Sequence, residues 1–171
     1  MYESHFGLKT KPFSKTPDHA FLYESPIHHE ALARLEYAVE EKELALLTGE
    51  IGSGKTTLTR ALMDRAGDQN DIVLITNPRL TPAQLLRNLA TRLDVKPDFH
   101  RADLIEQINE ALYARHQAGR GVVLLVDEAQ LIPGRSTFEE IRLLTNFQLD
   151  DENLLTVILV GQPELARRLK H

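Results

Sequence analysis

Two kinds of segment alternate along the chain. Four short runs are almost continuously apolar, which is typical of strands in a parallel sheet that is covered on both faces. These runs are 44–48, 72–76, 122–126 and 154–160. Between them, apolar residues recur every three or four positions, which predicts amphipathic helices. Strands that alternate with helices predict an α/β fold, with a parallel sheet and helices on both of its faces.

Capping signals indicate where several of these helices begin. Ser25 followed by Pro26 is typical of an N-cap and a first helical position, and predicts a helix that ends near Lys42. The segments Thr81–Gln84 and Ser136–Glu139 both fit a capping box, so each is predicted to open a helix. Apolar spacing predicts the remaining helices around residues 58–65, 104–113 and after 164.

A glycine-rich segment lies between the first predicted strand and the next helix. It fits the pattern G-x-x-x-x-G-K-[ST] and consists of Gly49, Glu50, Ile51, Gly52, Ser53, Gly54, Lys55 and Thr56, followed by Thr57. Glycines let the backbone wrap around a phosphate, and the helix that follows adds its positive end. We expect Lys55 to reach the β- and γ-phosphates of ATP and the Thr56 hydroxyl to bind Mg²⁺. The alternative is an ordinary glycine-rich turn, which the flanking strand and helix disfavour.

Two carboxylates follow the third predicted strand, at the end where α/β sheets place their ligands. We expect Asp127 to hold Mg²⁺ through water and Glu128 to orient and deprotonate the water that attacks the γ-phosphate. A solvated strand end is the alternative. Adjacent Asp and Glu favour an ATPase over a small-molecule kinase, which needs no base for water. Gln162, just beyond the fourth strand, is a candidate contact for the γ-phosphate and the water, or a simple turn residue before Pro163.

The composition excludes several classes of site. The chain has no cysteine, which excludes disulfides, thiolate zinc sites and a cysteine nucleophile. Its 7 histidines show no paired ligand spacing. The net charge of −5 disfavours nucleic-acid binding through bulk positive charge, although a local basic patch stays open. No apolar run approaches the roughly 20 residues that span a bilayer, and the amino terminus lacks an export signal, so we expect a cytoplasmic chain.

The chain divides into an arm and a core. Residues 1–24 contain prolines and interspersed aromatic side chains without periodicity, and we expect them to form an N-terminal arm. Aromatic faces suit an adenine base, so the arm is a candidate cover for the nucleotide, with plain packing on the sheet as the alternative. Residues 25–171 form the predicted nucleotide-binding core.

These motifs together resemble those of the AAA+ ATPases of the ExeA/GspA type, which are associated with the general (type II) secretion pathway. The resemblance covers nearly the whole chain and is carried by His5-Phe6-Gly7-Leu8, Asp127-Glu128-Ala129-Gln130 and Gly161-Gln162-Pro163-Glu164-Leu165, together with the glycine-rich segment. It implies a P-loop NTPase fold with strand order 5-1-4-3-2, Mg-ATP as ligand and Gln162 near the sensor 1 position. It also implies a homo-oligomer, a membrane protein of the secretion apparatus as partner, and a cytoplasmic domain that some members anchor in the inner membrane.

The same resemblance predicts that this chain ends before the fifth strand, the arginine finger and the helical lid. Because an arginine finger contributes about 10³- to 10⁵-fold in rate, we expect slow ATP hydrolysis by this chain alone. Two other functions stay open. One is a nucleotide-gated DNA-binding ATPase that regulates transposition, as in the TnsC/TniB proteins, which share the fold. The other is a scaffold that binds ATP and scarcely hydrolyses it.

Overall fold

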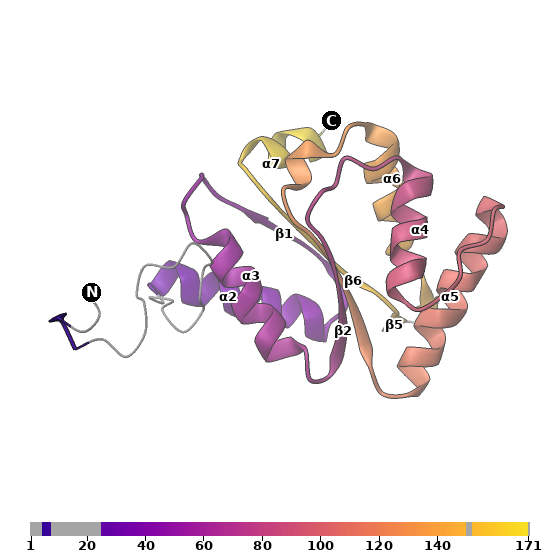
Figure 1. Ribbon diagram of the computed structural model, residues 1–171, viewed down its shortest axis with the longest axis horizontal. Helices are drawn as coiled ribbons and strands as arrows, with labels where there is room; N and C mark the ends of the chain where they lie inside the picture. The colour runs from indigo at the N-terminus through magenta and orange to yellow at the C-terminus, as the bar shows by residue number, and fades with distance from the viewer. Residues whose placement is uncertain (1–4, 8–24, 150–151, 171) are drawn as a thin grey trace.

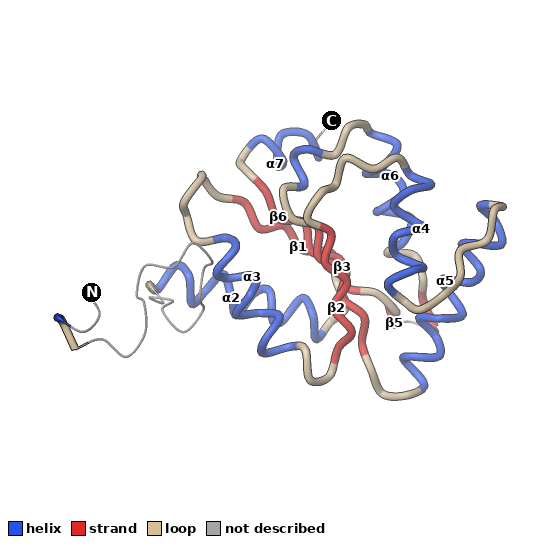
Figure 2. Tube along the Cα trace, viewed as in Figure 1, coloured by secondary structure: helices blue, strands red, loops and turns tan. Residues whose placement is uncertain are grey.

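The computed structural model describes residues 5–7, 25–149 and 152–170. Its main sheet has 4 parallel strands in the order β1-β6-β3-β2. Their bounds are Leu44–Thr48 for β1, Asn70–Ile75 for β2, Gly121–Val126 for β3 and Thr156–Gly161 for β6. The last strand of this sheet therefore lies between the first and the third, as the family resemblance implied. Figure 2 shows the strands running through the middle of the molecule, with helices on both sides.

Helices cover both faces of the sheet (Figure 1). One face carries α2 (Pro26–Glu40) and α3 (Lys55–Ala66), and the other carries α4 (Pro82–Arg92), α5 (Arg101–Gln117) and α6 (Arg135–Leu144). A short 3-10 helix, η2 (Ala129–Leu131), and α7 (Glu164–Leu169) lie at the carboxyl end of the strands. The α/β fold class predicted from the alternating pattern is confirmed.

The central strand β3 explains why its sequence is continuously apolar. Val122, Leu124 and Val126 pack into the core beneath α4, α5 and α6. Val123 and Leu125 point to the opposite face and pack with α2 and α3. Each of these side chains is at most 2% exposed. A strand that is buried on both faces has no position for a polar residue, and this leaves polar chemistry to the strand ends.

Strand β1 has the same apolar composition but a different environment. It pairs with β6 on one side, and its side chains alternate between half-buried and exposed. Leu44 is 46% and Leu46 is 40% exposed. The sequence pattern therefore identified a strand correctly without distinguishing a strand at the edge of the described sheet from a central one.

The helix starts were predicted with mixed success. The capping box at Thr81–Gln84 is confirmed, with both reciprocal hydrogen bonds formed. The capping box at Ser136–Glu139 is wrong, because α6 begins at Arg135 with Gly134 as its N-cap and no side chain of the described residues caps it. The hydroxyl of Thr137 instead donates to the carbonyl of Leu80 at 3.0 Å, which fixes the start of α6 against the segment before α4.

The region before the last strand also differs from the prediction. The strand expected over 154–160 begins later, at Thr156, and residues 154–155 form a buried approach to it. Before them, β4 (Gln148–Leu149) and β5 (Glu152–Asn153) pair as a short antiparallel ribbon. Two-residue strands produce no periodic signal, so the sequence pattern could not reveal them.

Two further predictions concern the N-terminal arm and helices that could cross a membrane. Of the arm expected over residues 1–24, only 5–7 belong to the described part, so the adenine cover lies outside it. Among the described helices, none combines the length and the apolar character that a bilayer crossing requires.

Candidate functional site

The glycine-rich loop, residues 49–56, follows β1 at the carboxyl end of the sheet and includes the first two residues of α3. The amide of Gly49 donates to the carbonyl of Gly161 at 3.2 Å, so the loop begins beside the end of β6. Gly52 and Gly54 have φ angles of 80° and 87°, in the left-handed region that glycine adopts with little strain. At Gly49, a Cβ atom would lie 2.5 Å from the Ser53 hydroxyl oxygen. The loop therefore requires its glycines to keep this tight curvature.

Positive charge gathers where this loop enters α3. The N-cap of α3 is Gly54, and within the described residues no side chain caps the first turn. The exposed amides of a helix start attract anions. The ammonium group of Lys55 donates to the carbonyls of Gly49 at 2.7 Å and Glu50 at 2.9 Å, so it lies folded over the loop. The loop thus combines a helix start that no described side chain caps with a cation.

Asp127 and Glu128 follow β3 at the same end of the sheet. The amide of Asp127 donates to the carbonyl of Ile75, and its carboxylate accepts the amide of Glu128 at 2.8 Å. Burial raises the pKa of Asp127, and the neighbouring charge of Glu128 adds to the increase; the hydrogen bond from the Glu128 amide and the charge of Lys55 oppose it. Lys55 therefore lies close enough to Asp127 for its charge to act on the pKa of that carboxylate.

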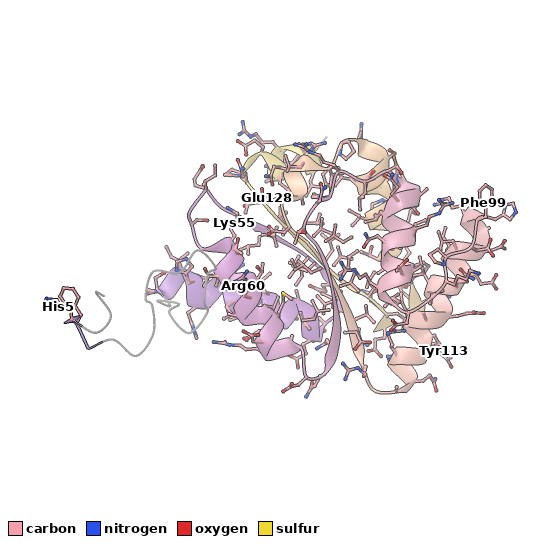
Figure 3. The ribbon with its side chains drawn as sticks, viewed as in Figure 1. His5, Lys55, Arg60, Phe99, Tyr113 and Glu128 are labelled. Atoms are coloured by element: carbon pink, nitrogen blue, oxygen red, sulfur yellow. The ribbon has the colours of Figure 1, made fainter. Side chains whose placement is uncertain are left out.

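A cavity of about 340 Å³ lies between these segments. Figure 3 shows Lys55 and Glu128 together at this end of the sheet. The lining residues are Ile51, Gly52, Gly54, Lys55, Thr56, Thr57, Glu128 and Gln162. The structure therefore brings most of the predicted site residues to one cavity. Gly49, Glu50 and Ser53 belong to the loop without lining the cavity, and Asp127 does not line it either.

The side-chain oxygen atoms near this cavity indicate which metal ion it could bind. Within the described residues, no three His, Cys, Asp or Glu side chains gather as a metal-binding group. Thr56 lines the cavity, and the Asp127 carboxylate belongs to the residue next to Glu128, which also lines it. Mg²⁺ is commonly bound by one or two protein oxygens, with phosphate oxygens and water completing its octahedron. The donor set therefore fits Mg²⁺ delivered with a nucleotide.

Sequence reasoning missed two residues that support the site. The imidazole Nε2 of His28 donates to the carbonyl of Ser53 at 2.9 Å, and its Nδ1 lies 2.7 Å from the Ser25 hydroxyl, so α2 is tied to the glycine-rich loop. Gln130, in η2, hydrogen-bonds to Glu128 and to the amide of Gln162. Gln130 belongs to the sequence motif 127–130, but only its contacts in the folded structure indicate a role. His28 had no distinguishing sequence signal.

Known proteins with similar sequences or structures point to one family. Residues 38–169 match the family described as AAA domain. The chain is 42% identical over 174 residues to general secretion pathway protein A of Aeromonas hydrophila, a match that covers 99% of this chain and 31% of that protein. The chain thus spans about a third of the length of this curated relative.

Two solved structures share the fold. Cdc6p from Pyrobaculum aerophilum aligns with a TM-score of 0.65 and 17% identity, over 88% of this chain and 42% of that one. The Drosophila ORC bound to DNA aligns with a TM-score of 0.61 and 21% identity, over 91% of this chain and 42% of that one. The fold and the resemblance expected from the motifs are confirmed by these matches.

Proposed function

The chain belongs to the AAA-domain family, and on this premise we propose that it binds Mg-ATP at the glycine-rich loop and hydrolyses the γ-phosphate bond. One observation carries the proposal. Three separate segments, the glycine-rich loop, the end of β3 and the end of β6, contribute Lys55, Glu128 and Gln162 to a single cavity. A cation, a carboxylate and an amide that converge in this way suit the charge and the water of phosphoryl transfer.

The phosphates are assigned to the positive side of the cavity. The amides at the start of α3 and the Lys55 ammonium group would hold the β- and γ-phosphates. Lys55 would exchange its bonds to two carbonyls for bonds to charged phosphate oxygens, which are stronger acceptors. Gln162 would contact the γ-phosphate.

The carboxylate side is assigned to metal and water. Thr56 and Asp127 would hold Mg²⁺, which neutralises charge on the phosphates. A metal cation also offsets the burial that raises the pKa of Asp127. Glu128 would then orient a water molecule in line with the γ-phosphate and accept its proton.

The biological setting follows the curated relative. We assign the hydrolysis to assembly of a type II secretion system, because the relative is a general secretion pathway protein. The proposed partners are further copies of this chain, in a homo-oligomer, and a membrane protein of that apparatus. The proposed location is the cytoplasm, where ATP is available. The relative favours this setting over regulation of transposition, and the net charge of −5 also disfavours a DNA-binding role.

The proposal is tested with two variants and one control. Lys55→Ala removes the ammonium group that is proposed to bind the phosphates. The dissociation constant for Mg-ATP should therefore rise by about 100-fold or more. Glu128→Gln should retain ATP binding and lose about 10²- to 10⁴-fold in hydrolysis, because only the base is removed. Titration calorimetry measures the binding, and phosphate release from labelled ATP measures the hydrolysis.

Lys96→Ala is the matched control, because Lys96 is an exposed lysine in the loop between α4 and α5. It should leave both quantities unchanged. Unaltered ATP affinity in Lys55→Ala, or unaltered hydrolysis in Glu128→Gln, contradicts the assignment.

A further inference from the structure

We propose that Gln130 is a positioning residue for Glu128, whose carboxylate it holds toward the cavity with its side-chain amide. The inference rests on the proposed function, since Glu128 is the group assigned to activate water. Gln130 acts through Glu128 and has no assigned contact with the nucleotide. The case rests on three hydrogen bonds that fix Gln130, on the space at Gly161 and on the backbone conformation of Glu128.

The side-chain amide of Gln130 makes two hydrogen bonds with different partners. Its Oε1 accepts the backbone amide of Gln162 at 3.1 Å, and its Nε2 donates to Oε2 of Glu128. A backbone N–H can only donate, so the oxygen of Gln130 must face Gln162. The NH₂ group is consequently directed at the carboxylate. The amide therefore links the ends of two neighbouring strands, β3 and β6.

The strand end beside Gln130 is shaped to admit this amide. A Cβ atom at Gly161 would lie 2.5 Å from Gln130 Oε1 and 2.9 Å from a methyl carbon of Leu165. Any larger residue at Gly161 would displace the amide or the chain around it. This close approach gives Gly161 a reason to be glycine that the turn alone does not supply.

The backbone of Gln130 is held as well as its side chain. Its carbonyl accepts a hydrogen bond from the guanidinium of Arg168 in α7. That guanidinium also lies over the ring of Phe138, 5.1 Å from its centroid. Both ends of Gln130 are thus anchored to elements outside η2, so the residue can hold the side chain of Glu128 in place without moving itself.

Glu128 needs an external constraint of this kind. Its φ angle is 51°, a left-handed conformation that non-glycine residues adopt at a cost. With Oε2 bound to Gln130, Glu128 still lines the cavity. Its second oxygen would then be the one that accepts a proton from water. Holding one carboxylate oxygen fixes the direction of the other, and a misplacement of about 1 Å at such a group can cost on the order of 100-fold in rate.

The test separates positioning from simple packing. Gln130→Ala removes both hydrogen bonds, whereas Gln130→Glu keeps an acceptor for Gln162 and sets a carboxylate against Glu128. Both variants should lower single-turnover hydrolysis of Mg-ATP by about 10- to 100-fold and leave the ATP dissociation constant within about 2-fold. Gln117→Ala is the matched control, because this exposed glutamine bonds to Tyr113 on its own helix.

A double variant identifies the residue through which Gln130 acts. In a Glu128→Gln background, Gln130→Ala should change the residual rate by less than about 2-fold, because two residues that act as a unit are not additive. An equal loss in both backgrounds would mean that Gln130 only supports the fold. Wild-type rates in both Gln130 variants, alongside a slow Glu128→Gln, would also overturn the inference and leave the proposed function intact.

A measurement without turnover covers the case in which the proposed function itself fails. If Glu128→Gln hydrolyses ATP as fast as the wild type, the base assignment is wrong, and if the wild type does not hydrolyse ATP, hydrolysis rates cannot report on Gln130. The side-chain amide signals of Gln130 in ¹⁵N NMR spectra then decide whether the link exists. They should shift in Glu128→Ala and stay in place in Gln117→Ala. Unshifted signals in Glu128→Ala would falsify the link.

Discussion

The two ends of the sheet differ in whether their charged side chains are paired with opposite charges. The cavity at the amino end, about 560 Å³, is larger than the 340 Å³ cavity at the carboxyl end. Several charged side chains that line it are paired: Lys42 bonds to Glu152, and Arg120 bonds to Asp71, which also bonds to Arg115. At the carboxyl end, Lys55 bonds to carbonyls and α3 starts without a side-chain cap in the described residues. Unneutralised groups, and not cavity size, indicate where a ligand belongs.

Two aspartates, one at each end, show this difference in their protonation. Burial acts to raise the pKa of both. At Asp71, hydrogen bonds and charges of Arg120 and Arg115 outweigh burial, and the pKa is lowered. At Asp127, burial and the charge of Glu128 prevail, and the pKa is raised. These opposite directions predict that the first carboxylate stabilises the fold, and that a nearby cation would favour the second, whose ionisation burial opposes.

The largest expected effect is on hydrolysis. Asp127→Asn removes the proposed metal carboxylate, so Mg-ATP hydrolysis should fall by about 100-fold or more, because the ion contributes several kcal/mol to the transition state. Asp71→Asn should leave hydrolysis per folded molecule unchanged, because Asp71 lies at the other end of the sheet. Phosphate release, corrected for the folded fraction by circular dichroism, measures both variants. Equal losses in the two would erase the functional distinction between the ends.

Sequence patterns predicted the fold because the elements that define it are strongly periodic. Strand β1 was predicted at its observed bounds, and the other three strands of the sheet were placed within two residues at each end. The failures involve tertiary contacts. The start of α6 is fixed by the bond from Thr137 to Leu80, which are far apart in sequence, and the β4–β5 ribbon is too short to leave a pattern.

The parts of the candidate site that are contiguous in the sequence were predictable. The glycine-rich loop and the Asp127-Glu128 pair are local motifs, and the structure brings most of the loop together with Glu128 at one cavity. Gln130 and His28 were missed because their roles depend on partners that tertiary folding brings close, Gln162 and Ser53. Their own neighbours in the sequence carry no trace of those contacts.

The second effect is on stability at the amino end. Asp71→Asn removes the negative charge that pairs with the guanidinium groups of Arg115 and Arg120. The Asp71 side chain is 33% exposed, so water weakens these ion pairs. We therefore expect the free energy of unfolding at pH 7 to fall by about 1–2 kcal/mol. The lowered pKa means that this contribution is full above the unfolded value of 3.8 and is lost as the pH falls through the folded pKa. Urea unfolding at pH 7 and in acid measures it. Asp68→Asn, an exposed aspartate nearby, should have little effect.

The smallest effect has the opposite sign and belongs to the carboxyl end. In the absence of metal and nucleotide, Asp127→Asn should raise the free energy of unfolding at pH 7 by about 0.5–1 kcal/mol, because it removes a carboxylate whose ionisation burial opposes. The amide oxygen of Asn can still accept the hydrogen bond from Glu128. Since the pKa is raised on folding, the cost of ionised Asp127 is present above the folded pKa and disappears below the unfolded value of 3.8. Urea unfolding in EDTA should therefore show the gain at pH 7 and none in acid. A variant less stable than the wild type at pH 7 would mean that Lys55 more than compensates the burial of Asp127, and that this end of the sheet is already neutralised like the other.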